Sequence, residues 1–185
     1  MSRAIQVRVS ESVVRTIHVE DGVESPLELL PVLAPDRMAE LLAKELEDQG
    51  FTRDGKLAKR TDGDIEIVID LEAAMVSVKI GAQSMLEEEI QLETRTAIEL
   101  QQQTEARLRG AAIDELELRL AAKTEAMRRE ITDKLEQKLA ELKTELDQAI
   151  GRATVEALTE RAQQLGTIEE IAKDEAGNVT IRVKL

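Results

Sequence analysis

The chain has 185 residues, of which 34% are charged and 1% are aromatic, and its formal net charge is −13. This acidity argues against nucleic acid and anionic membranes as partners, because both attract basic surfaces. The sequence contains no cysteine, which excludes disulfides, thiolate metal sites and a cysteine nucleophile. No apolar run approaches the ~20 residues of a membrane helix, so we expect a cytoplasmic protein.

The N-terminal part alternates apolar and polar residues, which is typical of half-buried strands. We expect a strand over 4–10, a turn at Ser10–Ser12 and a second strand over 13–19. Ser25 before Pro26 predicts a short helix to about Leu30, because proline is favoured in the first helical turn. A second helix is expected from about Asp36 to Gly50, where a glycine can end it.

The next segments predict a small antiparallel sheet. Residues 56–60 and 65–71 flank the turn Thr61–Asp64, and a further strand follows over 75–80. Residues 1–81 are therefore expected to form an α+β head with short helices.

A long stretch from Ser84 to about Leu165 contains mainly strong helix formers and no proline. Its apolar residues recur at about 3.7 residues per step, close to an eleven-residue repeat. We therefore expect residues 82–165 to form a helical, coiled-coil arm whose apolar seam pairs within or between chains. The seam residues are Leu86, Ile90, Leu108, Leu116, Leu120, Met127, Ile131, Leu135, Leu139, Leu142 and Leu146.

Residues 166–185 predict a β-hairpin, with Gly166 as the helix cap and a turn at Asp174–Gly177. Its layout repeats that of residues 50–71, so we expect it to complete the sheet of the head. A straight 80-residue helix would carry the hairpin about 120 Å away. Either the helix folds back near Gly110 or Gly151, or two chains form a swapped dimer; fold-back is favoured.

The predicted architecture is therefore an α+β fold in which a long helical arm is inserted before a C-terminal β-hairpin. Catalytic, cofactor and metal sites are not expected, because the chain lacks phosphate-loop, GxSxG, HExxH and CxxC motifs. The single histidine, His18, has no obvious catalytic partner. Asp62, Asp64 and Asp70 crowd one hairpin, so a metal-dependent hydrolase that uses these acids is a remote alternative.

Three segments resemble an accessory, X-type domain of bacterial FtsH ternary systems. They are SRAIQVRVSESVVR at residues 2–15, PLELLP at 26–31 and MAELL at 38–42. In that family, small proteins accompany a MoxR-type AAA+ ATPase, a von Willebrand A-domain protein and an FtsH-like component. The resemblance implies a non-enzymatic adaptor or scaffold that serves such an ATPase.

We therefore expect a protein-interaction module without enzymatic activity. Its expected partners are proteins, including an AAA+ ATPase, a von Willebrand A-domain protein or a second copy of the chain. A regulatory or substrate-delivery adaptor of the ATPase is the alternative.

Overall fold

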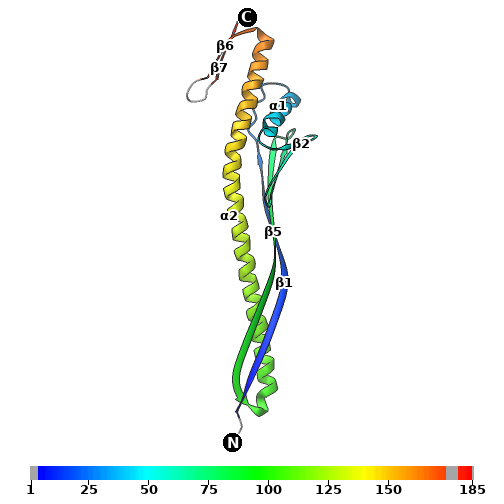
Figure 1. The fold of residues 1–185 in the computed structure, drawn as a ribbon, viewed down its shortest axis with the longest axis vertical. Helices are drawn as coiled ribbons and strands as arrows, with labels where there is room; N and C mark the ends of the chain where they lie inside the picture. Colours follow the sequence, from blue (N-terminus) through cyan, green and yellow to red (C-terminus); the bar gives the residue numbers. More distant parts are fainter. Residues whose placement is uncertain (1–3, 174–178, 185) are drawn as a thin grey trace. The chain divides into compact units, whose positions relative to one another are not determined.

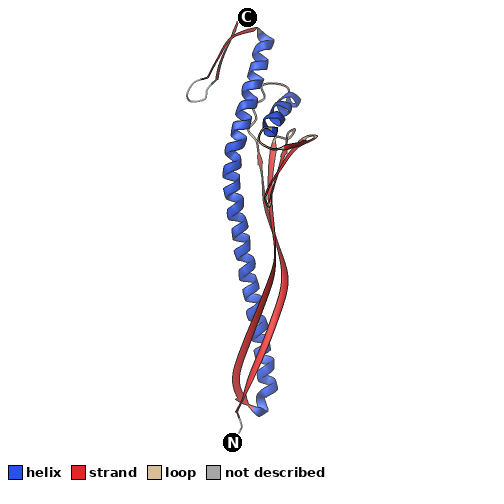
Figure 2. Ribbon diagram, in the orientation of Figure 1, coloured by secondary structure: helices blue, strands red, loops and turns tan. Residues whose placement is uncertain are grey.

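Figure 1 presents a computed structural model of the chain, which describes residues 4–173 and 179–184. The elements are β1 (Ala4–Pro26), α1 (Pro35–Glu47), β2 (Thr52–Asp54), β3 (Leu57–Asp62), β4 (Ile65–Asp70), β5 (Met75–Ala97), the 3₁₀ helix η1 (Ile98–Leu100), α2 (Gln101–Leu165), β6 (Thr167–Lys173) and β7 (Val179–Lys184). Figure 2 distinguishes the helices from the strands. A five-stranded antiparallel sheet, a long helix and a C-terminal hairpin confirm the predicted α+β class.

The chain divides into two compact units, each assembled from separate stretches of sequence. The first unit comprises Met1–Asp21 and Gly81–Asp133, and the second comprises Gly22–Ile80 and Lys134–Leu185. The strands β1 and β5 and the helix α2 each contribute residues to both units.

In the first unit, β1 and β5 are neighbouring strands, and one face of this pair is covered. The even-numbered residues from Ala82 to Thr96 are partly or fully buried, whereas their odd-numbered neighbours are exposed. This period of two is the signature of a strand with one covered face. Ile90 is buried in a cluster with Ala112 and Leu116 of α2, so the helix covers that face.

The second unit has its core between β4, β5 and the two helices. Ile65, Ile67 and Ile69 of β4 are buried and lie opposite Ile80, Val78 and Val76 of β5. The buried face of α1 consists of Met38, Leu41, Leu42 and Leu46, spaced as one helical stripe. Strand order in the sheet is β1-β5-β4-β3-β2, so the three-residue β2 is one edge and β1 is the other.

The structure corrects the expected N-terminal elements. No turn occurs at Ser10–Ser12, because β1 is continuous from Ala4 to Pro26. The three residues lack glycine, proline and asparagine, and the alternation stays in phase across them, with Val9 and Val13 on the same face. The helix predicted from Pro26 to Leu30 is also absent, whereas the helix predicted after Asp36 is confirmed as α1.

The long helix begins later than predicted. Residues 84–97 belong to β5, and α2 starts only at Gln101. Leucine and glutamate favour a helix in isolation, but pairing with β1 and burial of alternate side chains override this preference. From Gln101 the helix continues for 65 residues through both Gly110 and Gly151, so the expected fold-back at either glycine is wrong.

The C-terminal hairpin does not complete the five-stranded sheet as expected. Among the described residues, β6 and β7 pair only with each other. The predicted turn at 174–177 lies outside the described residues. Position 166 requires glycine, because the backbone of Lys184 comes close and a Cβ at this position would collide with its carbonyl oxygen.

Within the described residues, we find no helix with the length and apolar character needed to cross a bilayer.

Candidate protein-interaction surface

The predicted seam residues lie on two different elements. Leu86 and Ile90 are on β5, and the other nine are on α2. Those that are buried are Ile90, Leu116, Leu120, Ile131, Leu135, Leu142 and Leu146, whereas Leu86, Leu108, Met127 and Leu139 remain partly exposed. The seam was predicted to pair with another helix. The structure instead supplies strands and α1 of the same chain as neighbours for much of it.

In the first unit, polar pairs join the strands to α2 around a small apolar centre. Val13 and Leu92 pack against the cluster of Ile90, Ala112 and Leu116. Lys123 forms an ion pair with Glu88, Arg109 pairs with Glu11 at 3.0 Å, and Thr132 donates to Asp21 at 2.8 Å. The helix α2 thus supplies a partner for each of these three acidic side chains on the covered face of the strands, as the burial of charge requires.

In the second unit, three ion pairs join α1 to the C-terminal part of α2. Lys44 lies 3.0 Å from Glu156, Arg37 lies 2.5 Å from Glu160, and Glu45 bonds to Arg152. The hydrogen bond with Glu156 is the main cause that raises the pKa of Lys44. The pairs of Lys44 and Arg37 are exposed to solvent, which screens them, so they add little to stability. They fix which side of α2 faces α1.

A second polar cluster joins β3 to the same side of α2. Arg60 donates from Nη2 to Glu145 at 2.7 Å and lies 3.1 Å from Asp62. Lys138 approaches Asp62 to 2.8 Å. The hydrogen bond from Lys138 is the main cause that lowers the pKa of Asp62, and it raises the pKa of Lys138 in return. The side chain of Arg60 is only 13% exposed, so this cluster is a firm link.

An open apolar groove follows a neighbouring stripe of α2. It has a volume of about 570 Å³. One wall is the stripe Leu139, Leu142, Leu146 and Ile150 of α2, and the other is formed by Val23, Ser25, Pro26 and Leu27, with Val76 of β5 between them. The polar groups at its rim are Glu28, Lys143 and Asp147. Since β1 is the last strand of the sheet, the groove opens beside an edge strand.

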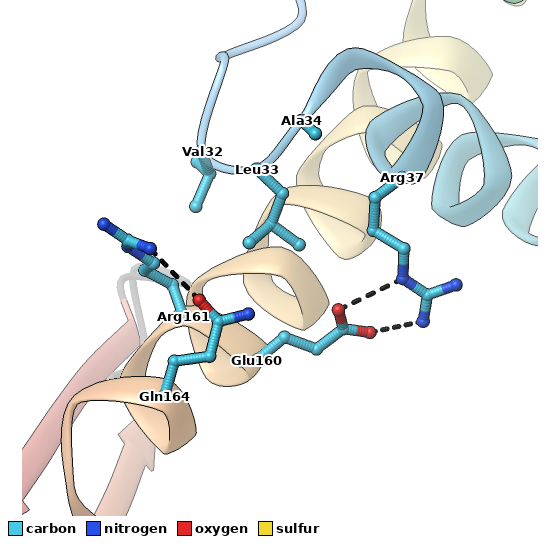
Figure 3. A pocket seen from close by; sticks show the side chains of 7 residues that line it. All are labelled: Val32, Leu33, Ala34, Arg37, Glu160, Arg161 and Gln164. Carbon is cyan, nitrogen blue, oxygen red and sulfur yellow. Dashed lines mark hydrogen bonds and ion pairs between the residues drawn. The ribbon is translucent and has the colours of Figure 1, made fainter.

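A smaller concavity of about 460 Å³ lies between residues 32–34 and the last turns of α2 (Figure 3). Arg37 directs two nitrogens at the carboxylate of Glu160, and Arg161 donates to Gln164 at 3.0 Å. The hydrogen bond between Arg37 and Glu160 is the main cause that raises the pKa of Arg37 above its ordinary value. The polar groups that line this concavity bond to one another, so we assign it to the packing of α1 on α2.

The acids of the hydrolase alternative are engaged separately. Asp62 bonds to Lys138 and Arg60, whereas Asp70 accepts the backbone N–H groups of Glu72 and Ala73 and so caps a turn. Asp64 is exposed. Within the described part of the chain, no group of three acidic, histidine or cysteine side chains is placed to hold a metal. His18 is exposed and lies 2.7 Å from Glu20.

Sequence reasoning found three residues of the groove, Leu139, Leu142 and Leu146, but not its other wall. The missing signal was the alternation of β1, which continues past Gly22 to Val23; Ser25, two residues on, also lines the groove. With a helix predicted from Pro26, these residues had no place beside α2.

The fold and this surface define an α+β protein whose long helix packs along strands of its own chain. The sequence profile of the family described as FtsH ternary system domain X5 matches residues 1–185. The chain therefore belongs to this family of accessory domains, as the resemblance of its N-terminal segments predicted. No curated protein and no solved structure gives a significant match.

Proposed function

We propose that this chain is a non-enzymatic assembly module of an FtsH ternary system. In this proposal the groove beside β1 receives an extended segment of another polypeptide chain. The observation that carries it is the open apolar wall of α2, where Leu139 and Ile150 remain partly exposed next to an edge strand. Apolar side chains in an open groove favour association, because association removes them from water.

The mode of binding follows from the two walls. An edge strand offers unpaired backbone groups to an added strand, and a neighbouring apolar surface accepts the alternate side chains of that strand. The backbone bonds give affinity, and the side chains in the groove give selectivity. The resemblance implies a MoxR-type ATPase and a von Willebrand A-domain protein as system components, and a role beside such an ATPase supports the proposal that the module works in the cytoplasm.

Affinity capture with the purified system components tests this proposal. We expect Leu139→Asp and Ile150→Asp to abolish capture, because each places a charge in the groove. Leu118→Asp is the matched control: Leu118 is also on α2 but is 66% exposed and lies outside the groove. Equal capture by all three variants, with unchanged helicity, contradicts the proposal.

An ATPase assay on the captured complex separates a scaffold from a regulatory adaptor. A scaffold leaves the ATPase rate of the AAA+ component unchanged, whereas an adaptor that regulates the ATPase alters it. Loss of that alteration in Ile150→Asp would assign the regulation to the groove.

A further inference from the structure

We propose that the groove is filled by β7 of a second copy of this chain, added as a strand along the outer edge of β1 beside Val23–Pro26. This inference rests on the proposed function and names the chain that supplies the segment. Val23–Pro26 of β1 and the whole of β7 belong to the second unit, and among the described strands neither β1 nor β7 has a neighbour on its outer side.

The side-chain pattern of β7 fits the groove. Val179, Ile181 and Val183 alternate with Thr180, Arg182 and Lys184, and the first set is partly buried while the second is exposed. An added strand must present apolar side chains on one face only, since its other face remains in water. The branched residues of β7 meet this condition opposite the leucine and isoleucine wall of α2.

The charges of the two strands are complementary. Glu24 and Glu28 are both exposed. Glu28 lines the groove, and Glu24 lies on β1 between the groove residues Val23 and Ser25. The exposed residues of β7 include the cations Arg182 and Lys184. Arg182 lies 3.1 Å from Glu170, whose side chain is highly exposed. Opposite charges on adjacent strands favour pairing, and like charges oppose it. The acidic edge thus selects a basic strand.

The lengths also agree. The helical wall from Leu139 to Ile150 is about 17 Å long at the rise of an α-helix. A six-residue strand such as β7 spans about 17 Å between its terminal Cα atoms. β7 therefore extends over the full length of the helical wall when it lies along the groove.

The chain's own β7 cannot reach this position. Gly166 packs against the carbonyl of Lys184, which holds that end of β7 at the end of α2. The wall from Ile150 to Leu139 lies about 22–39 Å back along the helix from Leu165. Val179, at the far end of β7, extends only about 17 Å from Lys184. A second copy must supply the strand, and reciprocal exchange closes a two-fold dimer.

The first test measures the mass of the full chain in solution. Light scattering over a range of micromolar concentrations should give twice the monomer mass for the wild type. Ile181→Asp, which places a charge on the apolar face of β7, and Ile150→Asp in the groove should each give the monomer mass. Leu158→Asp on an exposed part of α2 should remain dimeric and serves as the control.

The second test does not depend on the fold of the variant hairpin. A labelled peptide with the sequence of residues 179–184 should bind to the monomeric Ile181→Asp protein, whose groove is empty. Replacing Glu24 and Glu28 with lysine should weaken binding on the order of tenfold, because two attractive pairs become repulsive. A peptide that carries Arg182→Glu and Lys184→Glu should restore it.

Three results overturn the inference: a wild type that is monomeric at all concentrations, a dimer that both Ile181→Asp and Ile150→Asp leave intact, or a peptide that does not bind. A monomeric wild type whose groove variants still fail to capture system components would refute β7 as the occupant but leave the proposed function standing. A dimer that behaves as predicted, while the groove variants still capture the system components, would establish β7 as the occupant and show that those components bind elsewhere on the chain.

Discussion

The guanidinium group of Arg60 lies over the ring of Phe51, with its central carbon 4.5 Å from the ring centroid. The same group donates from Nη1 to the carbonyl of Gln49 at 3.1 Å and from Nη2 to Glu145 at 2.7 Å. One side chain thus connects β3, the segment after α1 and the helix α2. The planar fork of arginine allows this arrangement, because it can stack on a ring and donate sideways at once.

Replacing Arg60 with methionine should destabilise the protein by about 2–3 kcal/mol, because the carboxylates of Glu145 and Asp62 lose a largely buried donor. Arg60→Lys should cost less, since the charge remains while the fork is lost. Urea unfolding followed by circular dichroism measures both. Arg53→Met is the control: Arg53 is exposed on β2, and we expect an effect within about 0.5 kcal/mol. Equal effects at the two positions would contradict the role given to Arg60.

The pair Asp62–Lys138 predicts how stability depends on pH. The folded pKa of Asp62 is below its ordinary value, mainly because Lys138 donates to it. A depressed carboxyl pKa adds stability above the unfolded pKa, near 3.9, and this stability is lost as pH falls through the folded pKa. The difference in unfolding free energy between wild type and Asp62→Asn should therefore shrink below about pH 4. A difference that is constant from neutral to acidic pH would assign another role to Asp62.

The sequence predicted the short-range elements well and the long strands poorly. Gly63 adopts a φ of 66° in the turn between β3 and β4. Glycine is favoured in this conformation, so its presence marks the turn in the sequence. By contrast, residues 84–97 contain many helix formers, and only the partner strand decides their state. The alternation Ile90, Leu92, Thr94 was a usable signal, but Glu88 on the same covered face interrupts it, and only the structure shows that Lys123 neutralises this charge.

The groove was less predictable than the fold. Leu139, Leu142 and Leu146 were recognised as one apolar stripe, but a stripe does not identify what covers it. The neighbours of this stripe depend on β1 being an edge strand and on α1 packing against an adjacent stripe of α2, where Lys44 meets Glu156. These are long-range relationships, and no local pattern encodes them.

Replacing Leu116 with alanine should destabilise the first unit by about 3 kcal/mol, because it leaves a cavity beside Ile90 and Ala112. Leu118 is two residues away on the same helix and 66% exposed, whereas Leu116 is 4% exposed. Leu118→Ala should therefore change the free energy of unfolding by less than about 0.5 kcal/mol. Thermal unfolding of the two variants makes the comparison. Similar losses would show that the seam is buried against something other than the chain's own strands.

The three glycines in and after α2 should respond in opposite ways to alanine. At Gly110 and Gly151 an added Cβ meets nothing within 4 Å, so each substitution should stabilise the helix by about 0.5–1 kcal/mol. At Gly166 the Cβ would collide with the carbonyl of Lys184, so Gly166→Ala should detach β7 from the end of α2. Amide hydrogen exchange measures the result: protection should fall in β6 and β7 and persist in α1 and β4. A Gly166→Ala protein with a fully protected hairpin would mean that the backbone moves aside at little cost, so that Gly166 does not hold β7 at the end of α2.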